Sequence, residues 1–227
     1  MKKILSAPST FQAIFLDFDG VLAESMNVKT EAFIKLFEPY GNEIVKKIVQ
    51  HHKENGGISR YKKLQFYYSE YLHMPLSEQK LEELAQQFSD IVVEKVIEAP
   101  EVNGVKKFLN RYYKTIDLYV VSGTPQQEIR LIIQKRGMKK YFKGIYGIPD
   151  TKPTIIRRIL TEKGYNRKKV LYIGDSLSDY YDASEVNIPF FGRVIEKMAF
   201  SFPENVPVFS DFFDLLENGT KAISKPE

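Results

Sequence analysis

The most constraining feature of this 227-residue sequence is an apolar run near its start, residues 14–22, which carries two carboxylates, Asp17 and Asp19. An apolar run without polar alternation is typical of a strand buried on both faces, and such strands belong to parallel sheets in α/β proteins. Carboxylates are costly inside a sheet, but open α/β sheets bind their ligands at the carboxyl ends of strands. Paired oxygen ligands of this kind suit Mg²⁺. The run therefore predicts a parallel sheet with an acidic site at its edge.

Strand and helix patterns alternate in the second half of the chain. The patterns predict strands over residues 116–121, 170–173 and 188–191, and helices over residues 105–113, 125–136, 152–163, 179–186 and 211–216. Such a succession implies right-handed crossovers and a doubly wound parallel sheet, so the fold class is α/β. Residues 1–10 show no apolar period and predict a poorly ordered lead-in.

Residues 24–98 contain no strand pattern. Apolar residues recur there at spacings of three and four, and Leu84 and Phe88 belong to one such stripe. This stripe is typical of a helix-bundle core. We expect an all-helical domain over residues 24–98, inserted into an α/β core of residues 1–23 and 99–227.

Composition excludes several classes of protein. The chain has no cysteine, which excludes disulfides, zinc–thiolate sites and a cysteine nucleophile and favours a reducing compartment, so we expect a cytoplasmic protein. No window of about 18 apolar residues predicts a membrane span. The net charge of +4 is mild and the basic residues are interspersed with acids, so no nucleic-acid partner is expected. A small anionic substrate fits this composition.

Further polar residues follow the other predicted strands. Ser122, Gly123 and Thr124 precede Pro125, and this order predicts a helix N-terminus with Pro125 as first helical residue, Thr124 as N-cap residue and backbone N–H groups free for an anion. Lys152 begins a later predicted helix, where a cation is unfavourable unless it is solvated or paired with an acid. A second acidic cluster, Asp175 and Asp179, follows the strand over 170–173.

The order of these motifs resembles that of the haloacid dehalogenase-like hydrolase superfamily. The resemblance covers the chain from Phe11 to about Gly192, and the helical insert looks like the cap domain of that superfamily. It implies a Rossmann-like core, a Mg²⁺ cofactor and, most often, hydrolysis of phosphomonoesters through an aspartyl-phosphate. Asp19 favours phosphoryl transfer over dehalogenation, because family members that cleave carbon–halogen bonds need no acid at that place.

The resemblance also implies a role for each motif residue. Asp17 would be the nucleophile and Asp19 the general acid and base. Lys152 would offset charge on the nucleophile and phosphate. The remaining assignments are phosphate binding by Ser122, Gly123 and Thr124, metal binding by Asp17, Asp175 and Asp19 (the last through its backbone carbonyl), and orientation of the site by Asp179.

Two residues of the helical insert are candidate substrate contacts. The segment 56–60, which ends in Arg60, resembles the cap loop of β-phosphoglucomutase-like members, where the arginine contacts substrate phosphate; Arg60 would bind a second anionic group or would be solvated. Lys29 occupies the place where the mutases have a histidine, and a lysine there would bind an anion. The three histidines of the insert, His51, His52 and His73, are expected to be surface or packing residues.

Three functions stay open at this stage. The first is a phosphatase acting on a small phosphorylated metabolite, with a sugar phosphate as the first expectation. The second is a phosphosugar mutase of the β-phosphoglucomutase type. The third is a binding protein that has kept the fold, although clustered buried charges count against it. The sequence does not give the oligomeric state.

Overall fold

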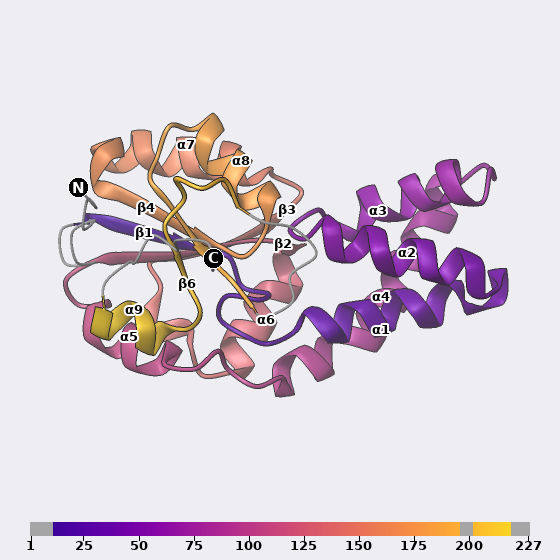
Figure 1. The fold of residues 1–227 in the computed structure, drawn as a ribbon, viewed down its shortest axis with the longest axis horizontal. Helices are drawn as coiled ribbons and strands as arrows, with labels where there is room; N and C mark the ends of the chain where they lie inside the picture. Colours follow the sequence, from indigo (N-terminus) through magenta and orange to yellow (C-terminus); the bar gives the residue numbers. More distant parts are fainter. Residues whose placement is uncertain (1–10, 196–201, 219–227) are drawn as a thin grey trace.

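A parallel six-stranded sheet forms the centre of the computed structural model, which describes residues 11–195 and 202–218 (Figure 1). The strand order is β3-β2-β1-β4-β5-β6, and each neighbouring pair is parallel. The first strand therefore lies inside the sheet, between the second and the fourth. The strands are β1 (Ala13–Leu16), β2 (Asp117–Pro125), β3 (Gly144–Ile148), β4 (Val170–Gly174), β5 (Phe190–Arg193) and β6 (Val208–Phe209).

Helices cover both faces of this sheet. One face packs against α7 (Lys152–Lys163) and α8 (Leu177–Glu185), and the other against α5 (Val105–Tyr112), α6 (Gln126–Lys135) and α9 (Phe212–Asn218). Successive side chains of a strand point to opposite faces. Phe15 accordingly packs on the face covered by α7 and α8, while Ile14 and Leu16 pack on the face covered by α5, α6 and α9. Burial on both faces explains the continuous apolar run of β1.

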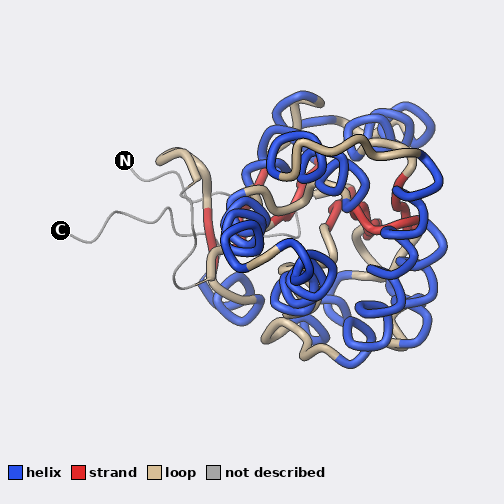
Figure 2. Tube along the Cα trace, turned by 90° about the vertical axis from the view of Figure 1, so that its right-hand side faces the viewer, coloured by secondary structure: helices blue, strands red, loops and turns tan. Residues whose placement is uncertain are grey.

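The helices between residues 26 and 98, called the cap from here on, lie at one end of the core (Figure 1). Figure 2 looks from the cap end and shows helices on both sides of the strands. The cap interior is aromatic, with the rings of Phe33 and Phe88 4.7 Å apart and Phe33 edge-on to Tyr67. Its elements are α1 (Met26–Phe37), a 3-10 turn (Glu38–Tyr40), α2 (Asn42–Glu54), α3 (Arg60–Phe66), a π-helical turn (Tyr67–Tyr71) and α4 (Glu78–Glu98).

The two chain segments that join cap and core lie side by side. Ala23 forms an antiparallel bridge with Glu101, and the Glu24 N–H donates to the Pro100 carbonyl at 2.8 Å. The Arg193 guanidinium binds both the Gly20 carbonyl (2.7 Å) and the Glu24 carboxylate (2.6 Å). These contacts fix the point from which the cap extends.

The predicted fold class is confirmed: the sheet is parallel, doubly wound and joined to a helical insert. Two strands, β3 and β6, were not predicted. Predicted helix ends differ by one or two residues from those observed, apart from α7, whose bounds agree. The lead-in expected over residues 1–10 lies outside the described residues. Among the described helices, none has the length and apolarity to cross a membrane.

Candidate active site

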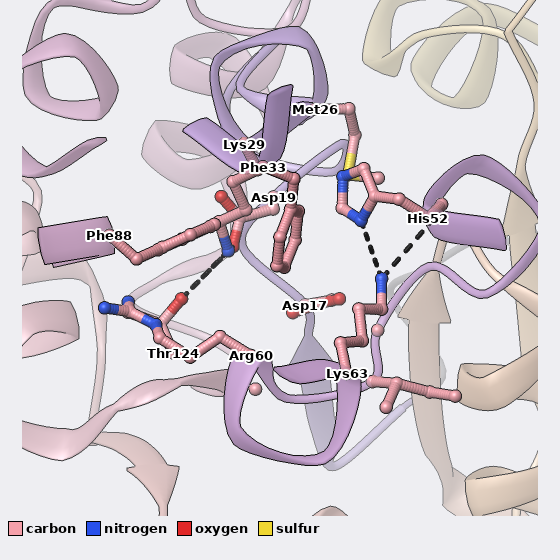
Figure 3. A pocket seen from close by; sticks show the side chains of 13 residues that line it. Asp17, Asp19, Met26, Lys29, Phe33, His52, Arg60, Lys63, Phe88 and Thr124 are labelled. Carbon is pink, nitrogen blue, oxygen red and sulfur yellow. Dashed lines mark hydrogen bonds and ion pairs between the residues drawn. The ribbon is translucent and has the colours of Figure 1, made fainter. Parts of the chain in front are cut away.

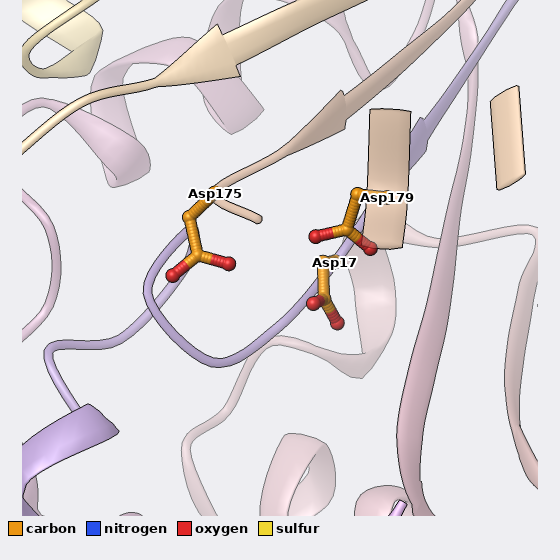
Figure 4. Close-up of side chains that lie close together, drawn as sticks. All are labelled: Asp17, Asp175 and Asp179. Atoms are coloured by element: carbon orange, nitrogen blue, oxygen red, sulfur yellow. The ribbon is translucent and has the colours of Figure 1, made fainter. Parts of the chain in front are cut away.

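Three buried aspartates converge where β1 and β4 end (Figure 4). Asp17 follows β1 directly, Asp175 follows β4, and Asp179 lies in the first turn of α8. Each offers a carboxylate oxygen, and these three oxygens lie within 4.8 Å of one another. The sheet creates the cluster, because β1 and β4 are parallel neighbours whose carboxyl ends meet at one edge.

Lys152 connects two of these carboxylates. Its Nζ lies 3.0 Å from Asp17 Oδ2 and 2.6 Å from Asp179 Oδ1, and the residue is only 6% exposed. Of the two expectations for this lysine, pairing with acids is therefore confirmed and a solvated surface position is wrong. Thr151 is the N-cap residue that starts α7 and so places Lys152 at its first position.

Asp179 is held by an unusually complete set of donors. Its carboxylate accepts from Ser176 Oγ (2.6 Å), from the Ser176 N–H (3.2 Å), from Tyr172 Oη (2.7 Å) and from Lys152. Ser176 and Asp179 thus form a reciprocal capping box at the start of α8. A Cβ on Gly174 would lie 2.4 Å from Asp179 Cβ, so a glycine is required where β4 ends. Asp179 orients Lys152, which supports the positioning role expected for it.

The three aspartates do not have equal proton affinities. Burial raises the pKa of Asp17 to about 7, against the opposing charge of Lys152. Burial, with the charge of Asp179 next, raises the pKa of Asp175 well above its usual value. Although burial opposes it, the charge and hydrogen bond of Lys152 lower the pKa of Asp179. One ammonium does not balance three carboxylates, so the cluster favours an additional cation.

Asp19 lies apart from this cluster and faces the cap. Its carboxylate accepts from Ser25 Oγ (2.7 Å) and Thr124 Oγ1 (3.3 Å) and forms an ion pair with Lys29 of α1. Although burial opposes it, the charge and hydrogen bond of Lys29 lower the pKa of Asp19. Lys29 Nζ also donates to Thr124 Oγ1 at 3.1 Å. Lys29, expected from sequence to bind an anion, binds the Asp19 carboxylate.

The end of β2 differs from the expected helix start. Pro125 is the N-cap residue and not the first helical residue, because the strand pairing runs to Pro125 and α6 begins at Gln126. Thr124 is not the N-cap residue, because its hydroxyl is bonded to Asp19. Ser122 is buried, and its Oγ accepts from the Thr124 N–H at 3.1 Å, which leaves its O–H as a donor. The expected phosphate-binding residues therefore lie in the last part of β2 and not at a helix cap, and Gly123 and Thr124 lie beside Asp17.

The cap loop closes over this edge of the sheet. A Cβ on Gly123 would lie 2.8 Å from the Gly57 carbonyl oxygen, and one on Gly57, whose φ is +77°, would lie 2.8 Å from Ser176 Oγ. Both glycines permit a close approach that larger residues would prevent. Core and cap are thus in direct contact above the three aspartates.

A small cavity of about 40 Å³ lies between the carboxylates and the cap (Figure 3). Arg60 lines it, but its guanidinium binds Glu128 of α6 at two points (2.5 and 3.2 Å), the Ala85 carbonyl, and Ser89 Oγ. The expectation that Arg60 is solvated is wrong, since the residue is 6% exposed. The cavity lining is formed by Asp17, Asp19, Met26, Lys29, Phe33, His52, Gly57, Ile58, Arg60, Lys63, Phe88, Gly123 and Thr124.

Four contributors to the site were not identified from sequence: Lys63, Ser25, Tyr172 and Glu128. Each is one of many residues of its type with no distinguishing spacing, and only tertiary packing brings it to the site. His52 was expected to pack or be exposed; it is buried, and it also lines the cavity.

The carboxylate cluster has the donor set of a hard divalent cation. It offers oxygen ligands alone, which suit Mg²⁺ better than zinc or copper. Gly20 makes room for one of them, because a Cβ there would lie 1.9 Å from Asp175 Oδ2. Asp17 and Asp175 would hold the ion, with Asp179 beside them. The Asp19 carboxylate is directed at Lys29, so only its backbone carbonyl is left for the metal role expected of this residue.

Solved structures share this fold. A predicted phosphoglycolate phosphatase from Haemophilus somnus 129PT superposes with a TM-score of 0.68 at 20% identity, covering 92% of this chain and 97% of that one. CbbY from Rhodobacter sphaeroides, in complex with phosphate, gives 0.70 at 15% identity (90% and 96%). YfnB from Bacillus subtilis, bound to magnesium, gives 0.67 at 15% identity (92% and 98%). At these identities the likeness shows the fold alone. No curated protein sequence matches the chain.

The sequence itself decides the family. The family model described as haloacid dehalogenase-like hydrolase matches residues 14–193, from β1 through the cap to the end of β5. This span contains the cap and the four motifs of the site, which carry Asp17, Ser122, Lys152 and Asp175. The chain therefore belongs to the haloacid dehalogenase-like hydrolase family.

Proposed function

We propose that the chain is a Mg²⁺-dependent phosphomonoester hydrolase that forms an aspartyl-phosphate on Asp17. The observation that carries the proposal is the joint position of Asp17, Lys152 and the end of β2, with Gly123 and Thr124, around one edge of the sheet. The names of the similar structures support it, because they include a predicted phosphoglycolate phosphatase and proteins solved with phosphate and with magnesium.

Asp17 would attack the phosphorus atom. The Phe18 N–H donates to Asp17 Oδ1 at 2.7 Å and Lys152 contacts Oδ2, so both carboxylate oxygens are oriented before substrate binds. Bound Mg²⁺ would offset negative charge on the phosphoryl oxygens and on the carboxylates. Ser122 Oγ–H and the N–H of Gly123 would donate to phosphoryl oxygens, while the charge of Lys152 favours the ionised form of Asp17.

Asp19 and Lys29 would handle the proton. Lys29 Nζ donates a hydrogen bond to the Asp19 carboxylate, so Asp19 must first take up a proton, from Lys29 or from solvent, before it can act as an acid. Asp19 would deliver a proton to the leaving oxygen and then, as a carboxylate, take one from the water that attacks the aspartyl-phosphate. Its lowered pKa favours the second of these steps.

The substrate would be a small phosphorylated metabolite. The cavity of about 40 Å³ shares Gly57, Ile58 and Gly123 with a larger groove of about 670 Å³ between cap and core, which Lys152 also lines. A sugar phosphate, expected from the sequence, therefore stays a candidate substrate beside shorter phosphorylated compounds.

The test is release of inorganic phosphate from a panel of phosphomonoesters with Mg²⁺, using Asp17→Asn as the inactive control. Release by the wild type alone supports the proposal. Interconversion of sugar phosphates that needs a bisphosphate, without net phosphate release, would indicate a mutase instead. Binding without turnover of any compound would indicate a binding protein.

A further inference from the structure

Three cationic side chains line the cavity under the cap, and two of them are neutralised by a carboxylate. Lys29 pairs with Asp19, and Arg60 pairs with Glu128 at 2.5 Å. Lys63 has no carboxylate within 4.0 Å among residues 11–195 and 202–218. Of the three cations, Lys63 is therefore the one whose charge is not balanced by a carboxylate in contact with it among the described residues.

The surroundings of Lys63 are neutral and buried. The residue is 2% exposed, and its Nζ donates to His52 Nδ1 at 2.7 Å and to the His52 carbonyl at 3.4 Å (Figure 3). The His52 pKa is lowered to about 2, by burial first and then by the charges of Lys63 and Lys29, so this imidazole is a neutral acceptor. Among the described residues, the third ammonium N–H has no hydrogen-bond acceptor, and the ammonium lies 6.0 Å from the centre of the Phe33 ring. A buried cation without a counter-charge is unfavourable, and a fold does not need one here.

We propose that Lys63 is a specificity-determining residue that contacts a second anionic group of the substrate, a carboxylate in a short phosphorylated acid. The proposal rests on the phosphatase function proposed above. Lys63 lines the same cavity as Asp17 and Asp19, so one small molecule can place its phosphate at Asp17 and its second anion at the ammonium. That anion supplies the missing counter-charge.

The other cations of the cavity are less suited to this role. An anion at Arg60 would compete with the two-point contact to Glu128, and an anion at Lys29 would compete with Asp19. The small volume of the cavity favours a carboxylate over a second phosphate, because a bisphosphate needs space at both ends.

The decisive comparison uses two substrates of nearly equal size. 3-Phosphoglycerate carries a carboxylate where glycerol 3-phosphate carries a hydroxymethyl group. In Lys63→Met, we expect kcat/KM for 3-phosphoglycerate to fall on the order of 10- to 100-fold, which is typical of a charged hydrogen bond, and kcat/KM for glycerol 3-phosphate to change by less than about 3-fold. Fructose 1,6-bisphosphate against fructose 6-phosphate tests a second phosphate in the same way.

Lys62→Met is the matched control. Lys62 neighbours Lys63 on α3 but is exposed and lines the adjoining groove between cap and core instead of the cavity itself. We expect this variant to keep the wild-type preference. A selective loss in Lys62→Met and not in Lys63→Met would place the second anion in the groove and overturn the proposal. Equal proportional losses for both substrates in Lys63→Met would also overturn it, because Lys63 would then support the cap.

A binding measurement separates this proposal from the proposed function. In Asp17→Asn, which cannot form the acyl phosphate, 3-phosphoglycerate should raise the melting temperature more than glycerol 3-phosphate does, and adding Lys63→Met should remove that difference. If the wild type releases phosphate from no compound, the proposed function fails and this binding comparison still decides the role of Lys63. If both ligands stabilise Asp17→Asn equally, the proposal for Lys63 is wrong.

Discussion

Arg60 of α3 and Glu128 of α6 form a two-point ion pair that joins the cap to the core, with distances of 2.5 and 3.2 Å. The Arg60 side chain is 5% exposed and the Glu128 side chain 20%. Ser89 Oγ, from α4, also donates to Glu128 at 2.7 Å. Two cap helices therefore meet one carboxylate of the core, and this contact is a candidate for holding the cap in place.

Glu128→Gln should weaken that contact and leave a buried guanidinium without its counter-charge. We expect a loss on the order of 2–4 kcal/mol in the free energy of unfolding, measured by urea denaturation. Glu31→Gln is the control, because its pair with Lys95 is exposed and should contribute less than about 1 kcal/mol.

If the role of Arg60 is to hold the cap against the core, Glu128→Gln and Arg60→Ala should lower kcat/KM for p-nitrophenyl phosphate by similar factors. A loss confined to Arg60→Ala, and to substrates with a second anion, would return Arg60 to substrate binding.

Asp17→Asn should abolish turnover and leave the fold intact. The amide is nearly isosteric but cannot form an acyl phosphate, and Lys152 keeps its second partner, Asp179. We expect at least about a 1,000-fold loss of kcat in the phosphate-release assay, with an unchanged far-UV circular dichroism spectrum. Activity near that of the wild type would show that another group is the nucleophile.

Lys29→Met should raise the pKa of Asp19, since the Lys29 charge and hydrogen bond hold it below its usual value. The acidic limb of the pH dependence of kcat, where the Asp19 carboxylate becomes protonated and can no longer activate water, should then move to higher pH. The measurement is kcat between pH 4 and 8 for both proteins. An unchanged acidic limb would show that Lys29 does not control the general base.

Chelation should remove the activity, and Mg²⁺ should restore it. Ca²⁺ should restore little, because its longer bonds and higher coordination number distort a site suited to octahedral Mg²⁺. Asp175→Asn should raise the Mg²⁺ concentration needed for half-maximal activity, because it removes one of the clustered carboxylates. Full activity of the wild type in excess chelator would contradict the metal assignment.

Lys63→Met should stabilise the protein most at neutral and acidic pH. Burial and the nearby Lys29 lower the pKa of Lys63 to about 7, against the opposing charge of Asp175. Between about pH 7 and 10, the unfolded chain binds a proton that folded Lys63 releases, so the stability of the wild type rises with pH in this window relative to Lys63→Met. Urea denaturation of both proteins at pH 6, 7.5 and 9 measures the difference. A difference that grows with pH would exclude this explanation.

The core of the site could be predicted because topology alone determines it. Asp17, Ser122 and Asp175 each follow or end a strand, and neighbouring parallel strands bring their carboxyl ends together whatever the loops do. The apolar runs of β1, β2 and β4 were sufficient to find those strands. β3 was missed because it is a five-residue edge strand with two glycines and only partial burial, which no run of apolar residues marks.

The cap contacts could not be predicted in the same way. That Arg60 meets Glu128, and that Lys63 meets His52 but no acid in the part of the chain that the structure describes, depends on how two separately packed units contact each other. The spacing of apolar residues within α3 or α6 does not predict that arrangement. The family resemblance placed Arg60 near the substrate, but only the structure shows that the core already supplies its counter-charge.

The bridge between Ala23 and Glu101 has a consequence for how proteins of this kind diversify. Because the chain leaves the core and returns to it at adjacent residues, a short turn could replace the whole cap without disturbing β1 or α5. Selection can therefore exchange or remodel the cap, and with it the preferred substrate, as a module. The aspartates proposed to carry out the chemistry are encoded outside that module and need not change with it.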